Sequence, residues 1–102
     1  MSQSAHQETR EIRLKRLRMR AWHRGIKEMD LILGGWADAH LASADDATLD
    51  QFEAVLEEAD QDLYQWISGQ KSAPDEIAGF LQIIGKQFGQ KFHNDNQELA
   101  LL

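Results

Sequence analysis

Residues 8–23 read ETREIRLKRLRMRAWH. Within this stretch, Leu14, Leu17 and Ala21 recur at the three- and four-residue spacing that places side chains on one face of an α-helix. Trp22 extends this apolar stripe, and the polar face is almost entirely arginine and lysine. A helix with an apolar stripe buries it against other elements, so the pattern predicts a helix that packs on the rest of the chain.

The rest of the chain shows the same helical spacing and no strand signal. No stretch alternates apolar and polar residues over the length of a strand, and proline occurs once, at Pro74. The further helices are expected from near Gly25 to about Ala42, from about Ala44 to Ala59, over a short segment after Asp60, and from a start marked by Ser72 and Asp75. Because every connection is short, the predicted fold is all-α, a compact bundle of about five short helices.

Several residues are predicted to begin or end these helices. Ser43 is the expected N-cap of the third helix, with Asp46 completing a capping box. Asp60 is the expected cap of the fourth helix, and Ser68 with Gly69 is expected to end it.

The chain of 102 residues is expected to form one domain, because a second hydrophobic core does not fit this length. The predicted domain covers residues 8–92, with residues 1–7 disordered and residues 93–102 frayed. Among the tryptophans, Trp66 is expected to be the nearest to pure core.

Two adjacent glycines lie in the middle of the second predicted helix. Gly34 and Gly35 each weaken a helix by about 1 kcal/mol relative to alanine. The alternative is that they allow another helix to pack closely.

Composition excludes several classes of protein. The chain contains no cysteine, so disulfide scaffolds, thiolate metal sites and cysteine nucleophiles are excluded. No apolar run approaches the roughly 18 residues of a membrane span, so no membrane insertion is expected. An arginine-rich start is compatible with a mitochondrial transit peptide, but Glu8 and Glu11 argue against one, which favours a bacterial cytoplasmic protein.

The net charge of −6 hides a segregation of charge along the chain. Residues 1–27 hold eight lysines and arginines against two glutamates, a net charge of +6. Residues 28–70 hold eleven acidic residues and no lysine or arginine. The basic arm and the acidic body are expected to attract each other within the fold and to present a polarised surface to a partner.

No pattern of reactive side chains predicts an enzyme or a metal site. None of the four histidines has a carboxylate or a second histidine at a metal-binding helical spacing. Ser43, Ser68 and Ser72 lie at predicted helix boundaries, where capping explains them. The segment from Gly79 to Lys86 lacks the spacing and the hydroxyl of a phosphate-binding loop. We therefore expect no catalytic residue and no bound metal.

The junction between the first two predicted helices is unusual. Arg24, Gly25 and Glu28 stand where the basic segment meets the acidic one. The glycine allows a sharp turn or the close approach of another backbone. Arg24 and Glu28 are four residues apart and are expected to meet on one helix face, a pair worth about 0.3 kcal/mol if exposed. Stability alone therefore explains little of this arrangement.

The string Arg24-Gly25-x-x-Glu28-x-Asp30 resembles the signature of the FAD assembly factor family. The flanking segments are similar to helices of that family, and the resemblance covers about residues 10–70. Members of this family promote covalent flavinylation of the flavoprotein subunit of succinate dehydrogenase. The resemblance implies a five-helix bundle that acts as an assembly chaperone and not as an enzyme.

The resemblance also implies a site and a partner. Gly25 would keep the surface flat for the partner's backbone, and Arg24 would donate charge-assisted hydrogen bonds to the partner. The implied partner is the flavoprotein subunit of succinate dehydrogenase or fumarate reductase, which keeps the FAD, so no tightly bound cofactor is expected and the chain is expected to be a monomer. The full set of expected partner-binding residues is Arg20, Arg24, Gly25, Lys27, Glu28 and Asp30.

Other functions stay open on the sequence. Arg13, Arg16 and Arg20 form a row that could follow the phosphates of a nucleic acid, but the acidic body would repel one, so we expect no nucleic-acid partner. The same face could instead be a solvated surface lying against the acidic helices. A flavin-binding or flavin-transferring protein is a third possibility, for which the sequence offers no phosphate cradle.

Overall fold

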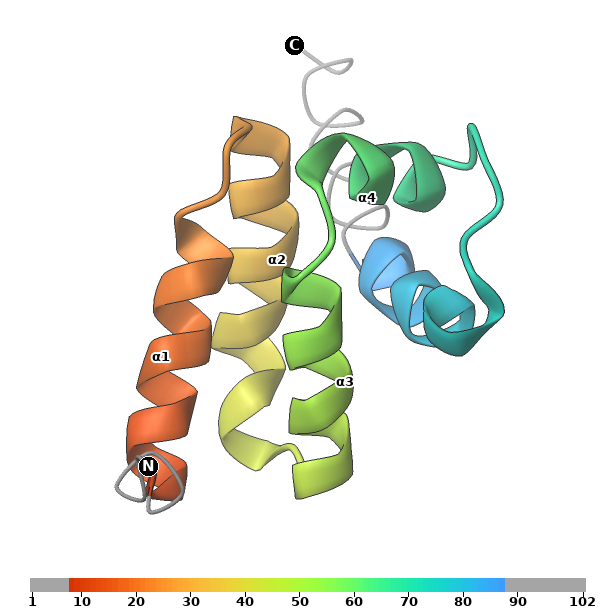
Figure 1. The fold of residues 1–102 in the computed structure, drawn as a ribbon. Coiled ribbons are helices and arrows are strands. Elements are labelled where there is room, and N and C mark those ends of the chain that lie inside the picture. The colour runs from red at the N-terminus through yellow and green to blue at the C-terminus, as the bar shows by residue number, and fades with distance from the viewer. Residues whose placement is uncertain (1–7, 88–102) are drawn as a thin grey trace, which may run out of the picture.

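The structure, a computed structural model, describes residues 8–87, and every regular element in that range is helical. The prediction of an all-α bundle of about five short helices is confirmed (Figure 1). The predicted ends of the chain, residues 1–7 and 93–102, lie outside the described residues. The elements are α1 (Arg10–Trp22), α2 (Lys27–His40), the 3₁₀ turn η2 (Leu41–Ser43), α3 (Asp46–Leu56), α4 (Asp60–Ile67) and a helix over residues 75–87.

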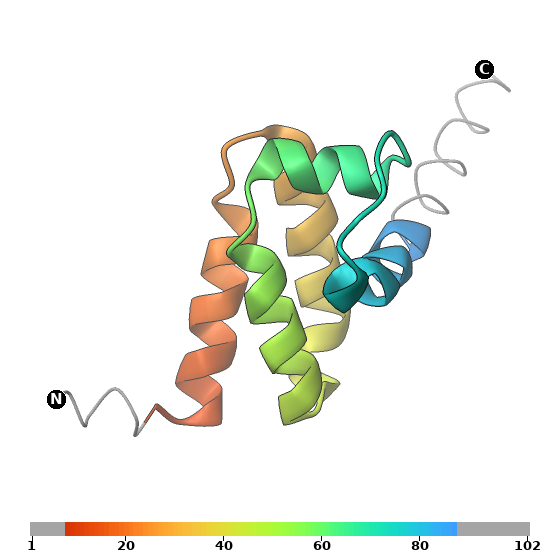
Figure 2. The same ribbon diagram turned by 45° about the vertical axis from the view of Figure 1, so that its right-hand side comes forward.

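Three helices form the body of the bundle. α1, α2 and α3 lie side by side, and the chain reverses direction from each to the next (Figures 1 and 2). α4 crosses the end of this body, and the helix over residues 75–87 lies beneath α4 on the side away from α1 (Figure 1). Because α1 and α3 run in the same direction and rise by the same distance per residue, side chains that face each other at one point still face each other after an equal number of residues on both helices.

Aromatic rings fill the core between α2, α3 and the helix over residues 75–87. Phe52 is fully buried and stacks on Trp36, with ring centroids 5.1 Å apart. Phe80 meets Trp36 edge-on at 5.1 Å. The prediction for Trp66 is wrong, because this residue is only half-buried near the end of α4. Trp36 takes the central position because the middle of α2 is covered by neighbours from both sides.

Two of the predicted helix caps are also wrong. Ser43 lies in η2, and the N-cap of α3 is Asp45, whose carboxylate accepts a hydrogen bond from the backbone N–H of Thr48 at 2.8 Å. Asp60 does not cap α4: it is the first helical residue, and Ala59 is the N-cap. The Asp60 carboxylate is bonded to groups outside its own helix, as described below.

α1 approaches α2 closely at Gly34. A β-carbon at this position would overlap the indole of Trp22, which lies across the helix. The indole N–H of Trp22 donates to the carboxylate of Asp38 at 3.3 Å and holds the ring in place. Close packing is therefore the explanation that the structure confirms for Gly34, whereas a β-carbon at Gly35 would meet nothing within 4 Å.

Gly34→Ala is expected to lower the free energy of unfolding despite the higher helix propensity of alanine. Propensity favours alanine by about 1 kcal/mol, but the methyl group would displace the Trp22 indole, and overpacking costs about 1–3 kcal/mol. Gly35→Ala is the matched control, and we expect it to stabilise the chain by up to about 1 kcal/mol. Urea unfolding of both variants measures the difference. A stabilised Gly34→Ala variant would contradict the packing described here.

Candidate functional site

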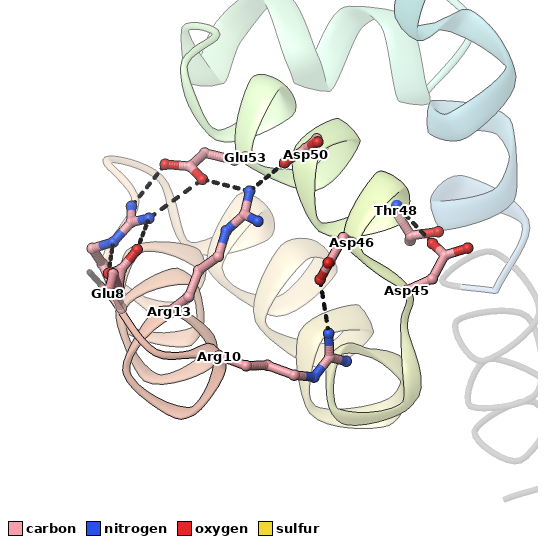
Figure 3. Close-up of polar contacts among 9 residues, drawn as sticks. Glu8, Arg10, Arg13, Asp45, Asp46, Thr48, Asp50 and Glu53 are labelled. Atoms are coloured by element: carbon pink, nitrogen blue, oxygen red, sulfur yellow. Dashed lines mark hydrogen bonds and ion pairs between the residues drawn. The ribbon is translucent and has the colours of Figure 1, made fainter. Parts of the chain in front are cut away.

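The basic face of α1 lies against the acidic face of α3, and we call the resulting row of ion pairs the arginine ladder. The nitrogen–oxygen distances range from 2.7 to 3.3 Å. Four of the pairs join residues 36 or 37 positions apart, as expected for two parallel helices that lie side by side, and Figure 3 shows three of these four. The pairs are Arg10–Asp46, Arg13–Asp50, Arg13–Glu53, Arg16–Glu53 and Arg20–Glu57.

The ladder confirms that the basic arm and the acidic body attract each other within the fold. It agrees with the interpretation of the basic face as a surface that lies against the acidic helices, because its arginines pair with acidic side chains of the same chain. Each exposed pair contributes little to stability, about 0–1 kcal/mol. The main structural effect of the row of ion pairs is that it aligns α1 along α3.

Glu53 occupies the centre of the ladder. Its carboxylate accepts hydrogen bonds from Arg16 at 2.8 Å and from Arg13 at 3.0 Å (Figure 3). The bond from Arg16, followed by the bond from Arg13, holds the pKa of Glu53 below its usual value of 4.5, although burial acts in the opposite direction. Arg16 also holds the pKa of Glu8 below its usual value, through hydrogen bonds of 2.8 and 3.0 Å.

Stability is expected to fall as the pH drops below about 4.5, the usual pKa of Glu53. A pKa that is lower in the folded state means that the unfolded chain binds protons more readily, so the contribution of Glu53 is present above this pH and is lost as the pH falls through the folded pKa. The Glu53→Gln variant should have a lower free energy of unfolding than the original chain at pH 7. Its free energy of unfolding should also fall less than that of the original chain when the pH is lowered. Urea unfolding between pH 7 and pH 3.5 tests both statements. Parallel pH profiles of the variant and the original chain would show that Glu53 is not involved.

Beyond the ladder, Arg24 binds the end of α3 and the start of α4. Its Nε donates to the carboxylate of Asp60 at 2.6 Å, and the two side chains are 10% and 16% exposed. Its terminal nitrogens donate to the carbonyl oxygens of Leu56 at 2.7 Å and Glu58 at 2.6 Å. Carbonyl groups at the end of a helix have no partner within the helix, so Arg24 satisfies groups that would otherwise need water.

The backbone of the same junction is bonded to two carboxylates. The N–H of Gly25 donates to Asp60, and the N–H of Arg24 donates to Asp30 at 2.5 Å. A β-carbon on Gly25 would lie 2.8 Å from the Asp60 oxygen, so a side chain here would push the Asp60 carboxylate out of its present position. We call the group Arg24, Gly25, Asp30 and Asp60 the clamp.

The clamp changes the interpretation of the motif residues. The predicted pair between Arg24 and Glu28 is absent, because Arg24 precedes α2 and its guanidinium turns to Asp60 instead. α2 begins at Lys27, not near Gly25, because the junction backbone is tied to the clamp carboxylates. Asp60 was not recognised as a site residue in the sequence, where it stands in a long acidic run with no feature that pairs it with Arg24.

Two of the predicted site residues remain exposed. Lys27 and Glu28 lie in the first turn of α2, and neither side chain forms an ion pair within residues 8–87. Arg20 lies next to the clamp and donates to the same Leu56 carbonyl as Arg24, at 3.2 Å. An open hollow of about 440 Å³ adjoins this junction and is lined by Met19, Arg20, His23 and Arg24.

The described part of the chain holds no metal-binding cluster and no membrane-spanning helix. Between residues 8 and 87, no three histidine, aspartate or glutamate side chains come together in a way that could hold a metal ion. No helix in this range has the length and apolar character needed to cross a membrane. Lys27 and Glu28 are exposed and can contact the polar surface of another molecule, and the hollow lined by Met19 and Arg20 adjoins the same junction.

Comparison with known proteins identifies the family. A family profile described as "Flavinator of succinate dehydrogenase" matches residues 15–86, which include the whole clamp. The chain belongs to this family. The resemblance to the FAD assembly factors is thereby confirmed, and it extends beyond the motif to almost the whole described part of this flavinator-family chain.

Individual relatives carry names that agree with the flavinator family. "Succinate dehydrogenase assembly factor 2, mitochondrial" of Mycosarcoma maydis is 34% identical over 96 residues, 92% of this chain and 40% of the relative. The protein of the same name from Meyerozyma guilliermondii is 44% identical over 59 residues, 58% of this chain and 44% of the relative. "FAD assembly factor SdhE" of Acetobacter pasteurianus is 36% identical over 66 residues, 65% of this chain and 61% of the relative. The chain thus spans less than two thirds of the length of these three relatives.

The expectation of a bacterial cytoplasmic protein is wrong by these comparisons. The matching flavinator-family proteins of fungi and of Arabidopsis thaliana are named as mitochondrial. One bacterial member also matches, so the relatives are mixed but lean towards mitochondrial proteins. Glu8 and Glu11 therefore do not identify the compartment.

Proposed function

We propose that this protein binds the flavoprotein subunit of succinate dehydrogenase and promotes the covalent attachment of FAD to it. The family match supports the proposal, as do relatives named for succinate dehydrogenase assembly and for FAD assembly. The observation that carries it is the clamp, which gathers the family motif into one rigid junction. That junction presents Lys27 and Glu28 outward at the start of α2.

In this proposal the motif residues divide into two groups. Arg24, Gly25 and Asp30 position the junction, because their polar groups are bonded within the chain. Lys27 and Glu28 touch the partner, because they are exposed on a fixed helix end. Rigid support of this kind limits the ordering cost of association. This division revises the hypothesis that Arg24 itself bonds to the partner.

The proposed mechanism is a shift of population in the partner. Covalent attachment requires the partner's histidine to be held at the flavin in a reactive geometry, and orientation alone can lower a barrier by several kcal/mol. A factor that binds the reactive arrangement more tightly shifts the population by its difference in affinity, about 5.5 kcal/mol for a change from 1:99 to 99:1. In this scheme FAD stays on the partner, and no proton-transfer group of this chain takes part.

The nucleic-acid alternative receives no support. Arg13, Arg16 and Arg20, the row that would follow phosphates, each pair with a carboxylate of the acidic body. A phosphate backbone would have to displace those carboxylates while being repelled by them.

We propose the flavoprotein subunit of fumarate reductase as a second protein partner, on the ground of its similar chemistry.

The test is the amount of covalent flavin on the flavoprotein subunit. Cells that express or lack this chain are denatured, their proteins are separated on a gel, and flavin fluorescence is measured at the flavoprotein band. We expect the fluorescence to fall to background without the chain and to return when the chain is supplied. Equal fluorescence in both cultures would contradict the proposed function.

A further inference from the structure

A second hollow lies between the end of α4 and the helix over residues 75–87, and none of the clamp residues lines it. It has a volume of about 620 Å³. Its lining is mixed: Trp66, Ile67 and Leu81 contribute apolar surface, and Lys71 and Lys86 contribute charged groups. The loop that joins α4 to the helix over residues 75–87 closes one side of the bundle here (Figure 2).

The backbone around this hollow is held in a defined shape. Gly69 has a φ of +84°, a left-handed conformation that side chains disfavour, and it ends α4. The N–H of Gln70 then donates back to the carbonyl of Gln65 at 2.8 Å, which closes the turn. On the other side, a β-carbon on Gly85 would lie 3.2 Å from a methyl group of Ile67, so glycine allows the two walls to approach. The hollow is therefore built into the bundle.

The cations of the chain divide sharply by type. All six arginines of residues 8–87 form ion pairs with carboxylates of the same chain. None of the four lysines in this range forms an ion pair with a carboxylate of residues 8–87. Two of these four, Lys71 and Lys86, line the same hollow, where Asp75 is the one acidic lining residue. In a chain with a net charge of −6, this hollow brings together two lysines that form no ion pair within residues 8–87.

We propose that this hollow is a docking site for an acidic segment of the partner protein that carries an apolar anchor. Trp66 is half-buried, so its indole can receive an apolar side chain, and aromatic residues of this kind are common centres of binding energy. Lys71 and Lys86 would face the carboxylates of the segment, and complementary charge of this kind accelerates encounter and fixes register. The proposal rests on the proposed function, since the partner is taken to be the flavoprotein subunit.

The test is the affinity of the full chain for the purified flavoprotein subunit at low and high salt. Lys71→Glu combined with Lys86→Glu is expected to weaken binding about tenfold at low salt and to reduce its dependence on salt. Lys15→Glu is the control, because Lys15 is an exposed lysine of α1 that does not line the hollow, and we expect a change of less than about twofold. Circular dichroism verifies that each variant is folded.

The outcomes separate this proposal from the proposed function. If the original chain binds and promotes flavinylation while the double reversal binds equally well, the docking site is wrong and the function stands. If Lys15→Glu weakens binding as much as the double reversal, the effect comes from net charge, and the docking site is again wrong. If the original chain neither binds nor promotes flavinylation, the proposed function fails, and this proposal fails with it.

Discussion

Arg24→Ala is expected to lower the free energy of unfolding by about 2 kcal/mol, because it removes one partner of a largely covered ion pair and leaves its hydrogen-bonding groups without a donor. The substitution would leave the Asp60 carboxylate, 16% exposed, without its cation. It would also leave the carbonyl group of Glu58 without its donor, and the carbonyl group of Leu56 with Arg20 as its side-chain donor. Chemical denaturation measured by circular dichroism gives the change directly. Any loss of flavinylation in this variant should follow the loss of folded protein.

A double-mutant cycle with Asp60 separates the clamp from a general effect of substitution. Asp60→Ala should also destabilise the chain, because Arg24 and the Gly25 N–H lose a common acceptor. The double variant should lose less free energy of unfolding than the sum of the losses in the two single variants. The difference, the coupling energy, should be about 0.5–3 kcal/mol. Arg18→Ala is the control, since that arginine pairs with Asp38 at 3.4 Å and is 47% exposed. Strict additivity would show that the clamp residues act independently.

Glu28→Gln is expected to reduce covalent flavin on the partner by about tenfold or more, as for the loss of an important charged contact in an interface. Glu28 is exposed and forms no ion pair within residues 8–87, so the free energy of unfolding should change by less than about 0.5 kcal/mol. The measurement pairs flavin fluorescence of the denatured flavoprotein with the stability of the purified variant. Loss of function with retained stability is the result that distinguishes a contact residue from the clamp.

Glu76→Gln is the matched control for this prediction. Glu76 is exposed in the first turn of the helix over residues 75–87, as Glu28 is exposed in the first turn of α2. Both substitutions therefore remove the same charge from the same part of a helix dipole. Normal flavinylation is expected with Glu76→Gln. If the two variants behave alike, Glu28 has no special role and the proposed contact surface is wrong.

Local patterns in the sequence predicted the helices well. The stripe of Leu14, Leu17 and Ala21 predicted a helix over residues 8–23, and α1 covers Arg10–Trp22. The caps were less predictable, because Ser43 and Asp45 are both good capping residues and the choice between them depends on where η2 ends. Trp66 was misplaced for a similar reason: helical spacing shows which face is apolar but not how much of it is covered.

The site was predictable in location but not in its bonding. The motif marked the junction after α1, and segregation of charge predicted attraction between the two halves. Neither could show that Arg24 bonds to Asp60, because that pair joins residues 36 positions apart and depends on how α1 lies along α3. The space restriction at Gly25 was equally hidden, since it is imposed by the Asp60 side chain of another helix.

The arginine ladder has rungs of nearly equal spacing on both helices, at steps of three or four residues. Such a row holds two helices together but does not fix the position of one along the axis of the other. A shift of one helical turn, about 5.4 Å, would offer each inner arginine another carboxylate. The clamp does not repeat in this way, since the Asp60 carboxylate bonds both to the Arg24 side chain and to the N–H of Gly25, where a β-carbon would crowd it. The motif residues therefore set the register of α1 against α3, because their contacts occur once whereas the ion pairs of the ladder repeat.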